Sequence, residues 1–208
     1  ERSDAAGSRT RVTDRRGYVT TMTYDSRGNV LTVTDPLNFV RSFTYDAADN
    51  LLAETDARGG VKTTTYNANH NPTSQTDALN QTTTFTYTAH GQLATETDPL
   101  GRVTTYAYNA RGDRTLTRDA LDGEWTATYD NLGRLLTETD PLGRTTTYTY
   151  NAANHVLTVT DPAGGVTTYT YDAVGNRLTV TDPRGGVTRT TYDNRDKVAT
   201  ETNALNHT

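Results

Sequence analysis

Apolar and polar residues alternate along short segments of this chain, and turn residues separate the segments at regular intervals. One such segment is Val-Thr-Thr-Tyr-Thr-Tyr at 166–171, and another is Leu-Thr-Val-Thr at 157–160 and again at 178–181. β-Branched and aromatic residues with a period of two predict strands. Turns come too often, and Glu and Ala are too sparse, for helices. The pattern therefore predicts short strands joined by tight turns along the whole chain.

These segments belong to a sequence repeat of 21 residues. Nine repeats fill residues 13–201 without insertion or deletion. Residues 1–12 correspond to the end of an earlier repeat (Ser3, Asp4 and Gly7), and residues 202–208 to the start of a later one, with Asn203 in the place of an aspartate. Repeat arrays normally end in atypical capping repeats, and neither end of this sequence has that character. We therefore expect a fragment of a longer chain.

Two residues define the repeat. We interpret the aspartate as the first residue of a turn, because its side chain can accept a hydrogen bond from the backbone two residues on. We interpret the tyrosine as an amphipathic ring that packs against neighbouring strands. The tyrosines are Tyr24, Tyr45, Tyr66, Tyr87, Tyr108, Tyr129, Tyr150, Tyr171 and Tyr192, and the aspartates are Asp14, Asp35, Asp56, Asp77, Asp98, Asp119, Asp140, Asp161 and Asp182.

Each repeat contains two turn signals, seen at 97–101 and at 171–175. The first turn starts at the aspartate, and the second starts at the residue after the tyrosine. Counted from that starting residue, the fourth residue of every turn is Gly, Asn, Asp or His, which are the residues that tolerate a positive φ. A type I turn followed by a left-handed residue makes a three-residue hairpin loop, so we expect hairpins at both places. The glycines in these positions are Gly17, Gly59, Gly101, Gly143, Gly164 and Gly185 in the first turn, and Gly28, Gly91, Gly112, Gly133 and Gly175 in the second.

The repeat length raises a question of register. With two three-residue loops, the strand residues of one repeat add up to an odd number, so each repeat would face the opposite way from the one before it. An identical pattern in every repeat requires each tyrosine to keep one environment. We therefore predict one extra residue per repeat, either in a four-residue loop after the tyrosine or in a β-bulge within a strand.

These features predict an all-β fold in which tandem antiparallel β-hairpin repeats of 21 residues form one continuous curled sheet. Nine hairpins supply about 18 strands, and open twisted sheets rarely exceed about 10 strands without curling or splitting. We expect a spiral ribbon, a tube or a shell wall, in which further repeats of the same chain or other copies pair with the open strands at either end.

Composition supports a wall that is one sheet thick. Only 33% of the residues are hydrophobic, and the chain has 13 Tyr but three Phe and one Trp. A wall without a second layer has no core to fill. No stretch approaches 18 apolar residues, so the sequence predicts no membrane span in this segment. The absence of Cys excludes disulfides, and a net charge of −5 without a basic stripe argues against nucleic acid.

Candidate chemistry is sparse. The histidines His70, His90, His155 and His207 lie near predicted turns and lack the spacing of a metal-binding motif. The aspartates lack the nonapeptide and EF-hand spacings of calcium sites, so we favour their role as turn acceptors. A catalytic pair should break the repeat, and no repeat does so. We therefore predict no enzyme, no catalytic residue, no metal site and no cofactor. Trp125 is the one outlier, and it marks either a contact site or, as we favour, a local packing substitution.

The repeat resembles the RHS/YD repeat family. The resemblance rests on Gly165-Val-Thr-Thr-Tyr-Thr-Tyr171-Asp172-Ala-Val-Gly175-Asn176-Arg-Leu178-Thr-Val-Thr-Asp182-Pro183, and it extends over essentially the whole chain. There are two departures from the family pattern. Asn67, Thr88, Asn109 and Asn151 replace the aspartate after the tyrosine, and Pro72 occupies a strand position, which predicts an irregular or exposed edge at 67–75.

The resemblance implies a long β-ribbon that spirals into a hollow cocoon around a C-terminal toxin domain, as in bacterial polymorphic toxins and ABC toxins, or a barrel as in teneurin-like surface proteins. It implies no catalytic residue in this segment. We expect a structural scaffold of a secreted or cell-surface bacterial protein that encloses a toxin cargo or builds an extracellular fibre. The alternative is an adhesion or carbohydrate-binding module whose repeated tyrosines contact a cell-surface glycan.

Overall fold

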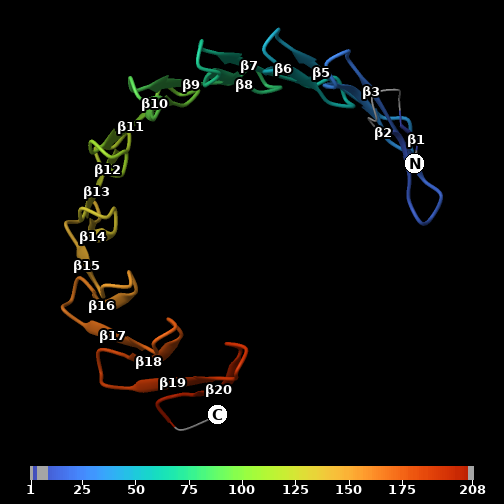
Figure 1. Cartoon of the computed structure of the whole chain (residues 1–208). Coiled ribbons are helices and arrows are strands. Elements are labelled where there is room, and N and C mark those ends of the chain that lie inside the picture. Colours follow the sequence, from blue (N-terminus) through green and yellow to red (C-terminus); the bar gives the residue numbers. More distant parts are fainter. Residues whose placement is uncertain (1, 4–8, 206–208) are drawn as a thin grey trace. The chain divides into compact units, whose positions relative to one another are not determined.

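The structure is a computed structural model of the chain, and it describes residues 2–3 and 9–205. Every regular element in these residues is a β-strand (Figure 1). Six-residue strands that end in the repeated tyrosine alternate with five-residue strands that end at the residue before the aspartate, as predicted from the period-two pattern. In the described ranges, no helix has the length and hydrophobicity needed to cross a bilayer.

The chain divides into two compact units, residues 1–104 and 105–208, with the boundary inside strand β11. The strands of the first unit are β1 (Arg2–Ser3), β2 (Arg9–Thr13), β3 (Val19–Tyr24), β4 (Val30–Thr34), β5 (Val40–Tyr45), β6 (Leu51–Thr55), β7 (Val61–Tyr66), β8 (Pro72–Thr76), β9 (Thr82–Tyr87) and β10 (Leu93–Thr97). Those of the second are β11 (Val103–Tyr108), β12 (Arg114–Arg118), β13 (Glu124–Tyr129), β14 (Leu135–Thr139), β15 (Thr145–Tyr150), β16 (Val156–Thr160), β17 (Val166–Tyr171), β18 (Arg177–Thr181), β19 (Val187–Tyr192) and β20 (Val198–Thr202).

Each strand pairs antiparallel with the next strand along the chain, from β1 to β10 in the first unit and from β11 to β20 in the second. The nine repeats supply β3 to β20, and the partial repeat before them adds β1 and β2. The predicted fold of tandem antiparallel hairpins with a 21-residue period is therefore confirmed. Among the described strands, the first and last strands of each unit pair with their sequence neighbours and not with each other, so neither unit is a closed barrel.

A β-bulge supplies the extra residue that the register argument requires. In the seventh repeat of the nine, Tyr150 pairs with Val156 and Thr149 pairs with Thr158, which leaves Leu157 without a partner in the ladder. The same shift follows the tyrosine in every complete repeat. Both hairpin loops contain three residues, so the bulge is the correct alternative and the four-residue loop is wrong.

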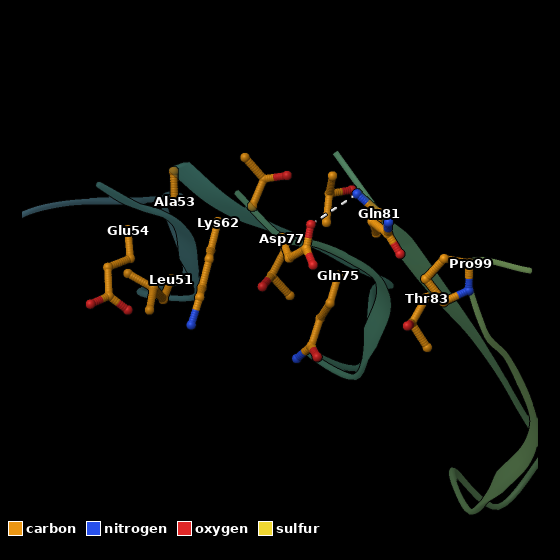
Figure 2. Close-up of a pocket in the computed structure, with 12 residues that line it drawn as sticks. Leu51, Ala53, Glu54, Lys62, Gln75, Asp77, Gln81, Thr83 and Pro99 are labelled. Carbon is orange, nitrogen blue, oxygen red and sulfur yellow. Dashed lines mark hydrogen bonds between the residues drawn. The ribbon is translucent and has the colours of Figure 1, made fainter. Parts of the chain in front are cut away.

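The bulge gives each repeat the same two faces. The tyrosine face carries the repeated tyrosine and the residues two and four positions before it. The opposite, threonine face carries cross-strand pairs of hydroxyls, such as Thr149 and Thr158, whose Oγ1 atoms lie 2.7 Å apart. Figure 2 shows the alternation in the first unit, where Glu54, Lys62 and Gln75 project from one side of the sheet.

Neither face has a core beneath it. No apolar side chain of the described residues is buried, and the one residue that is buried, Thr190, is polar and 7% exposed. The low apolar content of the sequence is thus explained by a sheet that has no second layer to pack against. Hydrogen bonds between strands and contacts along the two faces must hold such a sheet together.

Pro72 does not create an irregular edge, and that expectation is wrong. It is the first residue of β8 and pairs with Tyr66, and β8 pairs with both of its neighbours. The ladder from β8 to β9 begins only at Ser74. A proline at the first strand position therefore removes no ladder hydrogen bond on that side.

The partial repeats follow the same pattern where they are described. Ser3 occupies the place of the repeated tyrosine and pairs with Arg9, one end of a bulge. Asn203 occupies the place of the aspartate, and its Oδ1 accepts a hydrogen bond from the Leu205 backbone N–H at 2.9 Å. Asp4, Gly7 and His207 lie outside the described residues.

Deletion of Leu157 should be tolerated, whereas deletion of Thr147 should disrupt the second unit. Leu157 is the extra residue of a bulge, so its removal leaves Val156 opposite Tyr150 and Thr158 opposite Thr149, and later residues keep their faces. Thr147 pairs with Thr137 on one side and with Thr160 on the other, so its removal turns the residues beyond it to the opposite face. We expect the unfolding free energy to fall by about 1 to 2 kcal/mol for the Leu157 deletion, because Leu157 is partly exposed, and by more than about 3 kcal/mol for the Thr147 deletion. Urea unfolding followed by circular dichroism measures both. Equal losses would contradict the role of the bulge.

Candidate functional site

The repeated aspartates build the first turn of every repeat. The Oδ1 atom of Asp161 accepts hydrogen bonds from the backbone N–H groups of Ala163 and Gly165, both at 2.8 Å. The Gly164 N–H donates to the Asp161 carbonyl, which closes the type I turn. All nine repeated aspartates accept the same two backbone bonds, as expected of a residue that starts a turn.

The turns that follow the tyrosines use the same contacts. Asp172 accepts from the N–H groups of Val174 and Asn176. The four residues that depart from the family pattern keep this role: the side-chain oxygens of Asn67, Thr88, Asn109 and Asn151 accept the equivalent two bonds. The requirement at this position is therefore a short side chain with an acceptor oxygen, and negative charge is dispensable.

The fourth residue of all eighteen turns has a positive φ, between 58° and 98°. Glycine fills most of these places, because it has no Cβ to oppose the left-handed conformation. The glycines are Gly17, Gly59, Gly101, Gly143, Gly164 and Gly185 in the first turn, and Gly28, Gly91, Gly112, Gly133 and Gly175 in the second.

Hydrogen bonds keep several turn carboxylates ionised. A hydrogen bond from the Arg102 side chain, opposed by partial desolvation and aided by backbone N–H donors, lowers the pKa of Asp98 below its ordinary value. Arg144 lowers the pKa of Asp140 in the same way, and the Gly60 and Arg58 N–H groups lower that of Asp56. These groups are ionised at neutral pH and act as fixed acceptors, which is the opposite of what a general acid requires.

The repeated tyrosines connect one repeat to the previous one. The Tyr150 hydroxyl donates to the Leu135 carbonyl at 2.8 Å, and the Tyr66 hydroxyl donates to the Leu51 carbonyl at 2.9 Å. Burial raises the pKa of Tyr87, which keeps its hydroxyl protonated as a donor. The same bond, always to the carbonyl fifteen residues earlier, is made by Tyr66, Tyr87, Tyr129, Tyr150, Tyr171 and Tyr192.

The position of these carbonyls explains why a tyrosine recurs in every repeat. The ladder from β6 to β7 includes Ala53, Glu54 and Thr55 but stops short of Leu51. At that end the two strands are no longer joined by backbone bonds, and the Tyr66 hydroxyl binds the Leu51 carbonyl instead. The tyrosine thus closes the junction between repeats where the ladder ends, which is why it recurs with the period of the repeat.

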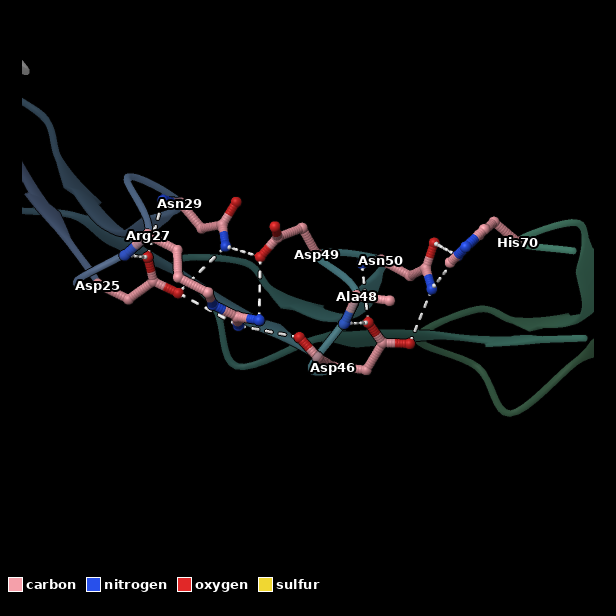
Figure 3. Close-up of polar contacts among 8 residues, drawn as sticks. All are labelled: Asp25, Arg27, Asn29, Asp46, Ala48, Asp49, Asn50 and His70. Carbon is pink, nitrogen blue, oxygen red and sulfur yellow. Dashed lines mark hydrogen bonds and ion pairs between the residues drawn. The ribbon is translucent and has the colours of Figure 1, made fainter. Parts of the chain in front are cut away.

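Polar side chains also join neighbouring turns along the tyrosine end of the sheet (Figure 3). The Asn29 amide donates to Asp25 and to Asp49 of the next turn, and Arg27 donates to the Asp46 carbonyl and pairs with Asp49. One repeat later, the Asn50 amide contacts the His70 ring at 3.0 Å. In both repeats the residue five positions after the tyrosine contacts the left-handed residue of the next turn.

At Gly175, a side chain of the previous repeat lies close to the place that a Cβ would fill. A Cβ on Gly175 would lie 2.8 Å from Cε1 of His155, whose ring stacks on Tyr171 with centroids 4.7 Å apart. Arg134 holds the same place one repeat earlier, with its guanidinium 4.9 Å from the Tyr150 ring centre. The sequence predicted glycine here for its φ alone, and it did not reveal this contact between turns.

The structure does not bring the histidines and Trp125 together into a metal or ligand site among the described residues. His70, His90 and His155 lie in separate turns, and the described part of the chain holds no cluster of His, Asp or Glu that fits a metal ion. Trp125 lies on β13, 41% exposed, and pairs with Thr117, one position after Glu124, which forms an ion pair with Arg118. The repeated tyrosines are half-buried and six of their hydroxyls bond to the backbone, which favours packing over ligand contact.

Replacing Tyr150 with phenylalanine should lower the unfolding free energy of the second unit by about 1 kcal/mol, because the bond to the Leu135 carbonyl is lost. Tyr18→Phe is the matched control, since Tyr18 is 55% exposed on an aspartate turn. That change should stay within about 0.5 kcal/mol. Urea unfolding checks both, and equal effects would contradict the role assigned to the repeated hydroxyl.

Alanine substitutions at Gly143 and Gly175 distinguish the stability cost of backbone strain from the cost of a lost contact between turns. Both have a positive φ, but a Cβ on Gly143 meets nothing within 4 Å. We expect Gly143→Ala to cost about 1 to 2 kcal/mol of unfolding free energy. Gly175→Ala should cost about 1 kcal/mol more, because it displaces His155 from Tyr171. In a double-mutant cycle, His155→Ala should remove this extra cost, and purely additive effects would contradict the contact.

The fold resembles known structures of toxin complexes. A crystal structure of TcdB2-TccC3 matches with a TM-score of 0.68 and 19% identity, over 97% of this chain and 12% of that one. The TcdB2-TccC3-Cdc42 complex matches at 0.58 and 17%, over 95% and 13%. The Photorhabdus luminescens Tc holotoxin pore matches at 0.57 and 17%, over 89% and 13%. At these identities the likeness shows the fold.

The sequence itself identifies the family. No curated protein matches it significantly. The profile of the RHS repeat matches seven overlapping segments, which are residues 4–39, 24–61, 66–100, 87–124, 129–166, 150–187 and 171–208. These segments include most of the chain and follow the phase of the tyrosines and aspartates described above. The chain therefore belongs to the RHS repeat family.

Proposed function

We propose that this chain forms part of the wall of an RHS-repeat shell, in a bacterial protein that is secreted or exposed at the cell surface. The observation that carries the proposal is the absence of a buried apolar core from the described residues of a sheet built of near-identical hairpins. Such a sheet has the construction of a wall. Its two faces stay available to whatever lies inside and outside, and its role is mechanical, without a catalytic step.

Exposed leucines at the aspartate turns support winding of the ribbon. The third residue of these turns is an exposed leucine in several repeats, at 77% for Leu79 and 76% for Leu100 in the first unit and 90% for Leu121 in the second. Apolar side chains in a row along one edge are unfavourable in water. In a spiral, the edge of one winding would lie against the next winding and cover them.

The toxin complexes support a cargo role for the shell. Their chains are about eight times longer than the matched part, since this chain spans 12–13% of their length. We propose that the repeats enclose a toxin segment of the same polypeptide. An extracellular fibre is the second form that the same ribbon can build. A glycan-binding role for the repeated tyrosines has less support, because their rings are half-buried and six of their hydroxyls donate to carbonyls.

Electron microscopy and protease protection of the complete polypeptide that contains these repeats test the proposal. We expect a hollow particle with a thin wall and a protected internal segment. Glu in place of both Leu79 and Leu100 should open the contact between windings and raise the rate of proteolysis at least about tenfold, because burying the new carboxylates is unfavourable. The matched control is Thr44→Glu, an exposed change on the threonine face.

Each outcome decides between the forms. Extended filaments would contradict enclosure of a cargo and favour the fibre. Solid particles, or a polypeptide that is digested as fast as its Leu79/Leu100 variant, would overturn the shell. Binding on a glycan array that is lost when Tyr150 or Tyr171 is replaced by alanine, with folding retained, would favour the glycan-binding alternative.

A further inference from the structure

One position on the tyrosine face is filled by a large side chain in most repeats. It lies two residues before the repeated tyrosine, on the same face of the same strand. Six repeats place an aromatic residue or methionine there: Met22, Phe43, Phe85, Tyr106, Tyr148 and Tyr169. Three repeats place a small residue there: Thr64, Ala127 and Thr190. Thr190 is buried, so the exceptions that leave space are Thr64 and Ala127.

The space at Thr64 is a hollow of about 300 Å³ (Figure 2). Half of its lining residues belong to the tyrosine face, namely Leu51, Glu54, Lys62, Thr64, Gln75 and Thr83. The other half are Ala53, Thr63 and Thr76 of the same strands and Asp77, Gln81 and Pro99 of the aspartate turns. Phe43 and Phe85 occupy the position of Thr64 in the repeats on either side. The hollow is therefore the place of one missing ring between two repeats that have one.

In one neighbouring repeat a cation lies beside the ring, and the repeat of Thr64 has a cation at the same place. In the preceding repeat, the guanidinium of Arg41 lies 6.0 Å from the ring centre of Phe43, two residues further along β5. Lys62 holds the place of Arg41 on β7, two residues before Thr64. A ring in the hollow would thus meet a cation in the arrangement that the chain itself uses next door. Glu54 and Gln75 add hydrogen-bonding groups at its rim.

The second exception shows that this face accepts a ring from elsewhere. Ala127 leaves a hollow of about 140 Å³ on the second unit, and Trp125, which lies two residues earlier on β13, lines it. An aromatic side chain therefore borders the place where this repeat lacks one. On β7 the residue two positions before Thr64 is Lys62, so the chain supplies no ring there.

We propose that the hollow at Thr64 is a binding site for an aromatic side chain, a phenol or indole ring of a bound polypeptide, which inserts beside Lys62. The ring would rest on Leu51 and the Lys62 methylenes, and a phenol hydroxyl or indole N–H would bond to Gln75 or Glu54. This site is separate from the packing role of the repeated tyrosines, and it does not depend on whether the ribbon forms a shell or a fibre.

Titration of the ¹⁵N-labelled chain with N-acetyl-tyrosinamide tests the site. We expect saturable shifts of the amides around 51–54, 62–64 and 75–77, with a dissociation constant on the order of 1 mM, as for a small fragment. Thr64→Phe fills the hollow and should weaken binding at least about tenfold. Lys62→Met keeps the stem and removes the charge, and it should weaken binding about threefold. Thr23→Phe, an exposed change on the threonine face of the first repeat that faces Thr32, should leave binding unchanged.

Three further measurements keep the result decisive. Thr64→Leu repeats the blocking test if Thr64→Phe does not fold. N-Acetyl-glycinamide, which lacks the ring, should not bind, and binding equal to that of the tyrosine compound would overturn the assignment. So would tighter binding of methyl glucoside, which would make the hollow a sugar site. Absence of saturable shifts, or binding unaffected by Thr64→Phe and Thr64→Leu, would also overturn it.

Discussion

Hydrogen bonds between laterally adjacent strands hold this structure together, because a sheet one layer thick has no core to do so. In most domains, apolar burial is the dominant stabilising contribution. Here no apolar side chain of the described residues is buried, so each strand depends on its neighbours. Where the backbone ladder between repeats stops, a tyrosine hydroxyl binds the free end, as Tyr150 does at the Leu135 carbonyl. The tyrosine hydroxyl thus extends the hydrogen bonding between strands beyond the end of the backbone ladder.

The 21-residue period follows from the same constraint. With two three-residue loops, the strand residues of one repeat add up to an odd number. The bulge after each tyrosine leaves one of them unpaired, so the rest keep the same faces in every repeat. Without the bulge, tyrosines of successive repeats would alternate between faces and half of them would lose their carbonyl. The acceptor residues of the turns set the loop geometry, and Thr88 shows how little they need, since its hydroxyl replaces a carboxylate. The 21-residue period therefore requires the bulge, and the bulge keeps every repeated tyrosine on one face.

A strict repeat makes its exceptions informative. Thr64 and Ala127 depart from a row of large side chains on the tyrosine face, and each leaves a hollow. Pro72 departs from the strand pattern without consequence, because it stands where the ladder makes no bond. The difference lies in what each position does in the repeat. Loss of a large side chain on the tyrosine face leaves an empty space, whereas proline can stand at a position whose backbone N–H makes no ladder bond.

Much of this architecture was determined by sequence alone. The phase of the tyrosines and aspartates defined the hairpins, the residues that tolerate positive φ located all eighteen turns, and parity demanded an extra residue, because these are local properties of loops and strands. Only the tertiary structure decided that the extra residue is a bulge, that Tyr66 reaches the Leu51 carbonyl, and that Asn50 meets His70. Those contacts join residues fifteen to twenty positions apart on different hairpins. Their geometry depends on how far neighbouring strands separate beyond the end of the ladder, and no pattern within a single repeat encodes that distance.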